Sequence, residues 1–363
     1  MANKYIIRLL CKLPPRQKRR FMLLLEGDRV WVHGGGSFGA ALKTAVGRFV
    51  PADRQQDKAG MRRLVSDIRR CYVRYDLLPA EYFYFGFAGK NWAQRDAYLT
   101  DSEEDAVLVS RIGYDKYLQD LSDKYHFYEL ARPFFHRAIM LFDGHTEKEA
   151  FRTFCLQVQH LFVKPLAGSE GDGSFIYEAG DDHAADSLFD RLFVSGKKWM
   201  LEERIRQSAE MAVWNASSVN TVRLPTFLTR QGFFVLAPIF RTGRAGRTVD
   251  NTSAGGVFAL IDARSGRICS EGYDIYSHVY AAHPDSGKTF MGAQIPQWEA
   301  LLKTAEAAHR SFRGHPYIAW DFALTEQGWE LIEGNWGRFR GAQIAGKKGL
   351  REQFLQYMDK SSL

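Results

Sequence analysis

The chain has 363 residues, 45% hydrophobic and 25% charged, and is long enough for two or three packed lobes with a large core. Its longest apolar run, residues 233–240, is far too short to span a bilayer, and no secretory signal pattern is visible. The four cysteines are scattered without CxxC or metal-ligand spacing, which predicts free thiols in a reducing cytoplasm.

The formal net charge of +7 is concentrated at the start of the chain, where residues 1–20 hold seven Lys or Arg residues and no acid. Lys4, Arg8 and Lys12 recur every four positions, which predicts a short basic amphipathic helix that Pro14 and Pro15 end. Such an arm can lie on an anionic membrane surface or pack on its own protein as a solubilising tail. Because the excess charge is confined to this arm, no general nucleic-acid-binding surface is expected.

The region 21–120 is predicted to be mostly helical, because residues 61–75 and 104–121 carry apolar residues at spacings of three and four. From about residue 150 the pattern changes to short strands and glycine-containing turns. Residues 219–240 predict a long hairpin that turns at Gln231 and Gly232, and residues 257–273 predict another. A helix is expected from residue 296 to about 310. Antiparallel strands with interleaved helices predict an α+β architecture.

Two glycine-containing segments resemble phosphate-binding loops only in part. Residues 33–39 contain GxGxxG, but no second strand with a ribose-binding acid follows them. Residues 285–289 end like a P-loop, but Ala282 stands where the pattern needs glycine. Both segments are therefore predicted to be turns or flexible loops.

A third glycine loop has better support. Residues 158–163 form a predicted strand that delivers Lys164 to the edge of a sheet, and Gly168, Gly171 and Gly173 follow. Backbone N–H groups of such a loop can close over phosphates, because glycine allows close approach to the oxygens. A plain hairpin loop is the alternative.

Two acidic residues near the C-terminus carry the strongest functional signal. Residues 317–323 and 329–335 read as strands joined by a turn. If that turn centres on residue 327, Asp321 faces Glu333 with Cβ atoms ~5 Å apart, and Asn335 lies on the same face. Like charges at that distance destabilise a sheet, whereas a divalent cation removes the penalty. Carboxylate and amide oxygens suit Mg²⁺ that also binds phosphate, and a solvated hairpin edge is the alternative.

These motifs occur in an order that resembles the ATP-grasp ligases, and most closely their subgroup associated with sugar transfer. The resemblance covers roughly residues 120–350 and includes residues 123–128, which are similar to the segment that precedes the grasp domain in that subgroup. The motifs in chain order are Lys164 with its glycine loop, the acidic strand end at 199–204, residues 220–223, residues 250–256, Asp321, and Glu333 with Asn335.

The resemblance implies an α+β ATP-grasp fold, in which two subdomains clasp ATP, over residues 121–363 behind the arm 1–20 and the helical region 21–120. The glycine lid and hinge would occupy about 150–210, and the metal and acceptor subdomain about 211–350. The implied ATP-binding residues are Lys164 at the α- and β-phosphates, Gly168, Gly171, Gly173 and Ser174 in the lid, Glu202, Glu203 and Ile205 at the adenine, and Glu210 at the ribose.

The resemblance further implies one or two Mg²⁺ ions, with Mn²⁺ as an alternative, on Asp321, Glu333 and Asn335. Arg223, Arg241 and Asn251 would lie near the transferred phosphate or the acyl substrate. The chain departs from many ATP-grasp ligases after Asn335, where Arg338 and Arg340 suggest an anionic group on a substrate.

The implied activity is ATP-dependent ligation of a carboxylate to an amine through an acyl phosphate, with a substrate from cell-envelope polysaccharide or amino-sugar conjugate synthesis. Two alternatives stay open. One is an ATP-grasp kinase that phosphorylates a small molecule or saccharide, and the other is a non-catalytic nucleotide-binding scaffold. The expected partners are small, anionic carboxylate and amine substrates rather than nucleic acid, and the expected location is the cytoplasm or the inner face of the membrane, with contact through residues 1–20.

Overall fold

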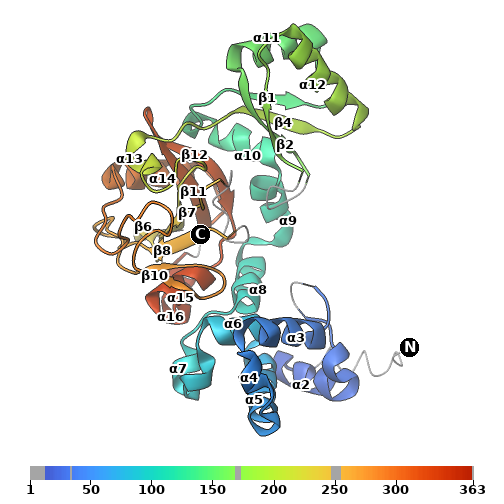
Figure 1. Ribbon diagram of the computed structural model, residues 1–363, viewed down its shortest axis with the longest axis vertical. Helices are drawn as coiled ribbons and strands as arrows, with labels where there is room; N and C mark the ends of the chain where they lie inside the picture. The colour runs from blue at the N-terminus through green and yellow to red at the C-terminus, as the bar shows by residue number, and fades with distance from the viewer. Residues whose placement is uncertain (1–12, 33–34, 168–172, 247–254, 362–363) are drawn as a thin grey trace.

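The computed structural model of the chain describes residues 13–32, 35–167, 173–246 and 255–361. Figure 1 shows a helical N-terminal region at one end, a large sheet in the middle and a small sheet at the other end. None of the helices within these residues is long and apolar enough to cross a bilayer. The expected mixture of helices and antiparallel sheets behind a helical N-terminal region is confirmed.

The N-terminal region is built from short helices around an aromatic core that includes Phe38, Tyr72 and Phe87. Asp57 caps the longest of these helices by accepting from the N–H groups of Ala59 and Gly60. The elements are α2 (Pro15–Glu26), η1 (Gly27–Arg29), α3 (Phe38–Phe49), α4 (Ala52–Gln55), α5 (Lys58–Tyr75), α6 (Pro79–Tyr84), η2 (Phe87–Gly89) and α7 (Trp92–Asp96).

Helix α2 begins at Pro15, directly after the arm whose predicted helix Pro14 and Pro15 would end. Proline is compatible with the first helical turn, where its missing N–H would have no partner. The predicted basic stripe at residues 4–12 lies outside the described residues. Residues 35–37 form the expected turn into α3, and Ser37 caps this helix. Residues 285–289 also form a turn, closed by a bridge between Ala282 and Thr289.

A chain of helices connects the N-terminal region to the small sheet. The continuous helix expected over residues 104–121 is interrupted, because Gly113 takes a φ of +88°. The connecting elements are α8 (Asp101–Ile112), α9 (Tyr114–Tyr117), η3 (Leu118–Ser122), α10 (Lys124–Ala131) and η4 (Arg132–Phe134).

The small sheet is antiparallel with the order β1-β4-β2-β3, and α11 (Lys148–Val158) and α12 (Asp182–Val194) cover one of its faces. Its strands are β1 (Ile139–Phe142), β2 (His160–Pro165), β3 (Phe175–Glu178) and β4 (Trp199–Glu203). The strand expected from Val158 begins two residues later, because Val158 ends α11. Leu161, Val163 and Leu201 point into the core beneath these helices, so the alternate residues Lys164 and Glu202 face the other way.

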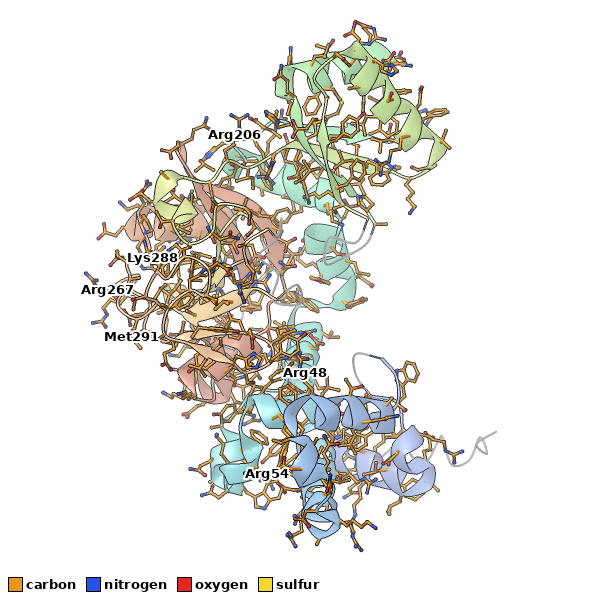
Figure 2. The ribbon with its side chains drawn as sticks, in the orientation of Figure 1. Arg48, Arg54, Arg206, Arg267, Lys288 and Met291 are labelled. Carbon is orange, nitrogen blue, oxygen red and sulfur yellow. The ribbon has the colours of Figure 1, made fainter. Side chains whose placement is uncertain are left out.

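The chain reaches the large sheet through residues 204–207, a linker that the label on Arg206 marks in Figure 2. The large sheet is antiparallel with the order β10-β9-β8-β7-β5-β11-β12, and β6 pairs with β5. The elements from this linker to the C-terminus are α13 (Ala209–Ala212), β5 (Thr221–Thr229), β6 (Gly232–Val235), β7 (Ile239–Thr242), β8 (Val257–Leu260), β9 (Gly272–Tyr273), β10 (Val279–Tyr280), α14 (Trp298–Ser311), β11 (Tyr317–Thr325), β12 (Gly328–Asn335), α15 (Arg340–Gly346) and α16 (Arg351–Lys360).

Strand β11 is buried on both faces, and the alternation of its side chains between these faces determines where the site lies. Ile318, Trp320 and Phe322 pack in the core with α14, whereas Tyr317 and Ala319 pack on the other face with residues of α15 and α16. Asp321 continues this second face beyond those helices, where the face opens into a cavity.

The carboxylate hairpin has the predicted pairing of Asp321 with Glu333. The turn itself differs, because Thr325 pairs with Gly328 and the turn therefore centres between Glu326 and Gln327. A β-bulge at the step after Asp321 leaves Ile332 as the extra residue and restores the predicted partner.

Candidate active site

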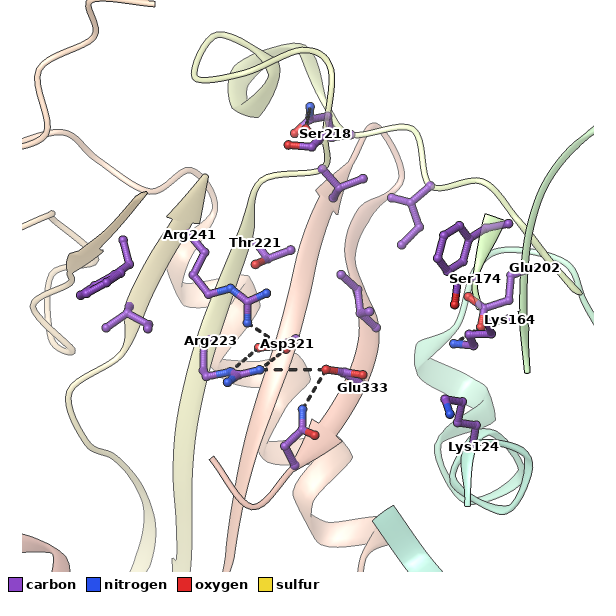
Figure 3. A pocket seen from close by; sticks show the side chains of 18 of the residues that line it. Lys124, Lys164, Ser174, Glu202, Ser218, Thr221, Arg223, Arg241, Asp321 and Glu333 are labelled. Carbon is purple, nitrogen blue, oxygen red and sulfur yellow. Dashed lines mark hydrogen bonds and ion pairs between the residues drawn. The ribbon is translucent and has the colours of Figure 1, made fainter. Parts of the chain in front are cut away.

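Three adjacent strands bring a row of charged side chains to one face of the large sheet. Asp321 on β11 pairs with Arg223 on β5 and with Glu333 on β12. Directly paired residues project from the same face, so all three side chains point into the cavity. Figure 3 shows this row with Arg241 beside it.

Asp321 is only 2% exposed, and both of its carboxylate oxygens accept hydrogen bonds from arginines. Arg223 donates from Nε at 2.8 Å and from Nη2 at 2.5 Å, and Arg241 donates from Nη1 at 3.2 Å. Burial raises the pKa of Asp321, but the charges of Arg223 and Arg241 outweigh it and lower the pKa to about 2. Asp321 is therefore ionised at neutral pH and held in a fixed orientation.

Glu333 has a different environment on the same row. Its side chain is 51% accessible because it faces the cavity, although the residue lies deep within the fold. It accepts a hydrogen bond from Asn335 Nδ2 at 3.0 Å, and Arg223 Nη2 lies 4.0 Å from Oε1. Burial and the charge of Asp321 raise its pKa. A cation between the two carboxylates would relieve this repulsion.

The donor set at this position suits a hard divalent cation that also binds a ligand. No three His, Cys, Asp or Glu side chains converge as a preformed metal cage in the part of the chain that the structure describes. Glu333 and Asn335 offer oxygens toward the cavity, and Asp321 lies beside them. Mg²⁺ commonly takes one or two carboxylates and completes its shell with water and phosphate oxygens, so these residues fit it.

The small sheet forms the opposite wall, from which Lys164, Glu202 and Ser174 face the row (Figure 3). Lys164 makes an ion pair with Glu202, which also accepts from Arg137 Nη2 at 2.7 Å. Burial raises the pKa of Glu202, but the charges of Arg137 and Lys164 lower it to about 2. The ionised Glu202 thus fixes Lys164 at the cavity.

Arg137 also joins the two sheets, because its Nη1 donates to Glu330 on β12 at 2.7 Å. Its guanidinium is buried between the two carboxylates of Glu202 and Glu330. Removing one partner of such a buried network leaves an uncompensated charge, so the network couples the position of the small sheet to that of the large one.

Residues of both walls line a single cavity of about 1300 Å³. This volume exceeds the roughly 300–1,000 Å³ of a pocket for one small ligand, so the cavity has room for a nucleotide and a second substrate. The predicted site residues that line it are Lys164, Ser174, Glu202, Glu203, Ile205, Arg223, Arg241, Asp321, Glu333, Asn335, Arg338 and Arg340.

Some predicted residues are not brought to this lining. Gly173 precedes Ser174 with a φ of +74°, a conformation that favours glycine, but does not itself line the cavity. Glu210 is exposed on α13 and also lies outside the lining, so the structure gives no support to its ribose role. Gly168, Gly171 and Asn251 lie outside the described residues.

The two arginines after Asn335 have partners that the sequence did not indicate. Arg338 pairs with Asp105, and Arg340 pairs with Asp101, both acids belonging to α8. A substrate anion at either arginine would therefore share it with a carboxylate. These pairs tie the end of the carboxylate hairpin to the helical region.

Sequence reasoning missed two cations at the small-sheet wall. Lys124 lines the cavity and donates from Nζ to the carbonyl of Leu166 at 3.0 Å, and burial and the charge of Lys164 lower its pKa. Lys124 lies in the segment 123–128, whose resemblance to the family pattern was visible in the sequence, and Asp123 caps α10 there. No local sequence pattern indicated the role of Arg137, because its partners Glu202 and Glu330 are distant in the sequence.

Two α+β units enclose one cavity between the small sheet, which carries Lys164, and the row of Arg223, Asp321 and Glu333 on the large sheet. This arrangement defines an ATP-grasp fold. Residues 106–360 match the family described as "Sugar-transfer associated ATP-grasp", which is more than half of the chain. The chain belongs to this family. The match begins inside α8, earlier than the expected boundary near residue 120.

Solved structures to which the chain is similar include D-alanine–D-alanine ligase from Bacillus anthracis, with 13% identity, a TM-score of 0.38 and 67% coverage of each chain. D-alanyl-alanine synthetase A from Vibrio cholerae has 10% identity, a TM-score of 0.44 and coverages of 69% of this chain and 67% of that one. The ATP-grasp ligase PsnB has 13% identity and a TM-score of 0.42, and the match covers 70% of this chain and 63% of PsnB. No curated protein matches the chain significantly.

Proposed function

We propose that this protein is an ATP-dependent carboxylate–amine ligase that forms an amide or peptide bond. The observation that carries the proposal is the shared cavity, in which Lys164 and Glu202 face the row of Arg223, Asp321 and Glu333. Membership of the ATP-grasp family supports ATP as the energy source.

ATP would bind with its phosphates between the two walls. Lys164 would contact the α- and β-phosphates while Glu202 holds it in place, and Ser174 with Gly168, Gly171 and Gly173 would close over them. Phe162, Ile176 and Met200 line the same wall and offer an apolar surface for adenine. Glu203 and Ile205 lie where this wall enters the linker and would meet the purine edge.

The acidic row would hold one or two Mg²⁺ ions through Asp321, Glu333 and Asn335, and the same hard donors accept Mn²⁺. When bound, the metal supplies positive charge that offsets the charge of the phosphates. Arg223 and Arg241 donate hydrogen bonds to Asp321, and either would also donate to a phosphate or a substrate carboxylate bound beside it. Asn251 is proposed to act near the same transferred group.

The chemistry needs no protein nucleophile. A substrate carboxylate oxygen attacks the γ-phosphorus, ADP leaves, and an acyl phosphate forms. The amine then attacks the acyl carbon, inorganic phosphate leaves, and the amine loses a proton. Lys164 and Arg223 would stabilise developing charge, and a closed lid would keep water from the acyl phosphate.

The first alternative is a kinase that phosphorylates a hydroxyl group and stops. Phosphate release from Mg-ATP that requires both a carboxylate and an amine supports the ligase, whereas a phosphorylated product that forms without an amine supports the kinase. A non-catalytic scaffold would bind Mg-ATP without turnover, and the retained Lys164, Asp321 and Glu333 argue against it.

The family's association with sugar transfer supports a substrate from cell-envelope polysaccharide or amino-sugar conjugate synthesis. The proposed location is the cytoplasm or the inner face of the membrane. Helix α2 supports membrane contact near residues 1–20. Its residues Phe21, Leu24 and Leu25 are exposed, and the basic Lys18 and Arg20 flank them. An apolar stripe with cationic flanks suits an anionic lipid surface.

A further inference from the structure

The cavity extends past the row of Arg223, Asp321 and Glu333 to the N-terminal helical region. Arg48 of α3 and Tyr84 of α6 line it there, together with Arg340 and Ile344 of α15. Figure 1 shows the N-terminal helices and the small sheet at opposite ends of the large sheet. Figure 2 places Arg48 at the boundary between the N-terminal helices and the large sheet. This end is therefore remote from the wall that carries Lys164.

Arg48 differs from the two arginines that follow Asn335. Arg338 and Arg340 are neutralised by carboxylates of α8, whereas Arg48 forms no ion pair with any acid in the described residues. Its Nη2 donates to the carbonyl of Ile275 at 2.7 Å, and its guanidinium lies 4.0 Å from the ring centre of Tyr276. Its buried Nε has no hydrogen-bond partner. Arg48 is thus oriented by neutral groups and keeps an uncompensated charge.

Tyr84 lies between two of these cations. Its ring centre is 6.0 Å from the Arg48 guanidinium and 5.7 Å from that of Arg340. Burial raises the pKa of Tyr84, although both arginines oppose this, so the phenol keeps its proton and remains a donor. The Nε of Arg340 is also buried without a partner. Buried donors are normally satisfied, so the unpaired Nε atoms show that the protein leaves part of the hydrogen-bonding capacity of Arg48 and Arg340 unused.

We propose that this end of the cavity binds the second substrate of the ligase through an anionic group carried on a ring or apolar body. The guanidinium of Arg48 can donate two parallel hydrogen bonds to a carboxylate or a phosphate. Tyr84 adds a hydroxyl donor and an aromatic face. Phe258, Ile275 and Ile344 line the adjacent wall and would contact the body of the substrate. This inference rests on the proposed function, because it assumes that the other end of the cavity holds ATP.

Three sugars serve as probes in the presence and absence of Mg-ATP. Glucuronate carries a carboxylate on a ring, glucose 1-phosphate carries a phosphate on a ring, and glucose is the neutral control. Binding is measured by ligand-observed NMR or calorimetry on the full chain. We expect at least one charged probe to bind more tightly than glucose, and the preferred probe identifies the anion as carboxylate or phosphate.

Arg48→Ala should weaken binding of the preferred probe roughly ten- to a hundredfold, because a charge-assisted hydrogen bond is lost. Tyr84→Phe should weaken it less, since only one neutral donor is removed. Arg54→Ala is the matched control, because Arg54 is exposed on α4 in the same region. Thermal melts show whether loss of the Ile275 contact unfolds Arg48→Ala, in which case Arg48→Gln and Tyr84→Phe decide the question.

The affinity for Mg-ATP separates this inference from the proposed function. It should change by no more than about twofold in Arg48→Ala, as expected for distant sites. Normal Mg-ATP binding with no preference for either charged probe over glucose would overturn the second site alone. Equal probe affinity in wild type and Arg48→Ala would overturn the role of Arg48. Arg48-dependent probe binding without any Mg-ATP binding would overturn the ligase proposal instead.

Discussion

Asp321 and Glu333 face each other on one row, but only the substitution of Asp321 should destabilise the protein. Asp321→Asn leaves Arg223 and Arg241 without their buried counter-charge, and breaking such a pair costs about 3–5 kcal/mol of unfolding free energy. Glu333→Gln removes a carboxylate whose folded-state pKa is raised by burial and by Asp321, so its ionised form opposes folding at neutral pH. That variant should be unchanged or more stable, by at most about 1 kcal/mol.

Urea unfolding at neutral pH without metal measures both effects, and ATP turnover is measured on the same preparations. Both variants should lose roughly a hundredfold or more in turnover, because each removes a carboxylate that would hold the Mg²⁺ whose positive charge offsets that of the phosphates. Mg²⁺ should raise the melting temperature of the wild type more than that of Glu333→Gln. Full turnover in Glu333→Gln, or equal stability losses in both variants, would refute the roles assigned to this row.

Three further predictions concern nucleotide binding, stability at acidic pH and the N-terminus. Lys164→Ala should weaken Mg-ATP binding in calorimetry, and an unchanged affinity removes Lys164 from the nucleotide site. The pKa of Asp321 is lowered from 3.8 to about 2, so its ionised form should contribute about 2 kcal/mol to the free energy of unfolding above pH 4, and this contribution should be lost as the pH falls toward 2. The stability of Asp321→Asn should therefore depend less on pH over this range than that of the wild type, and an equal pH dependence of the two proteins would contradict this. Deleting residues 1–15 or changing Leu24→Ser should reduce sedimentation of the protein with anionic vesicles. Val194→Ser, at the exposed end of α12, is the control and should not reduce it. Equal sedimentation of all variants would leave the N-terminus without a membrane role.

The parts of the site that follow from local periodicity could be predicted from the sequence. Strand alternation and a short turn were sufficient to pair Asp321 with Glu333, even though the turn centre was wrong and the bulge at Ile332 restored the register. The strand predicted over residues 158–163 was expected to deliver Lys164 to the edge of a sheet, and Lys164 lies near the end of β2 and lines the cavity. These features depend on residues within one hairpin or one strand, where geometry is nearly fixed.

Contacts between distant segments could not be predicted in this way. Arg340 pairs with Asp101 across 239 positions, so the arginine that seemed available to a substrate is largely neutralised. Glu202 looked like a hinge acid near adenine, but its partners Arg137 and Lys164 make it a buried counter-charge. The position of Arg48 at the cavity also depends on how the helical region packs against the large sheet, which no local sequence pattern predicts.

The most direct test of the ligase proposal follows an oxygen atom. The protein is incubated with Mg-ATP, a pool of carboxylates labelled with heavy oxygen and a pool of amines, and the products are analysed by mass spectrometry. Attack by the carboxylate predicts an amide product together with inorganic phosphate that carries one labelled oxygen, both dependent on the amine. Phosphate without label, or a phosphorylated hydroxyl compound formed without amine, would contradict the account.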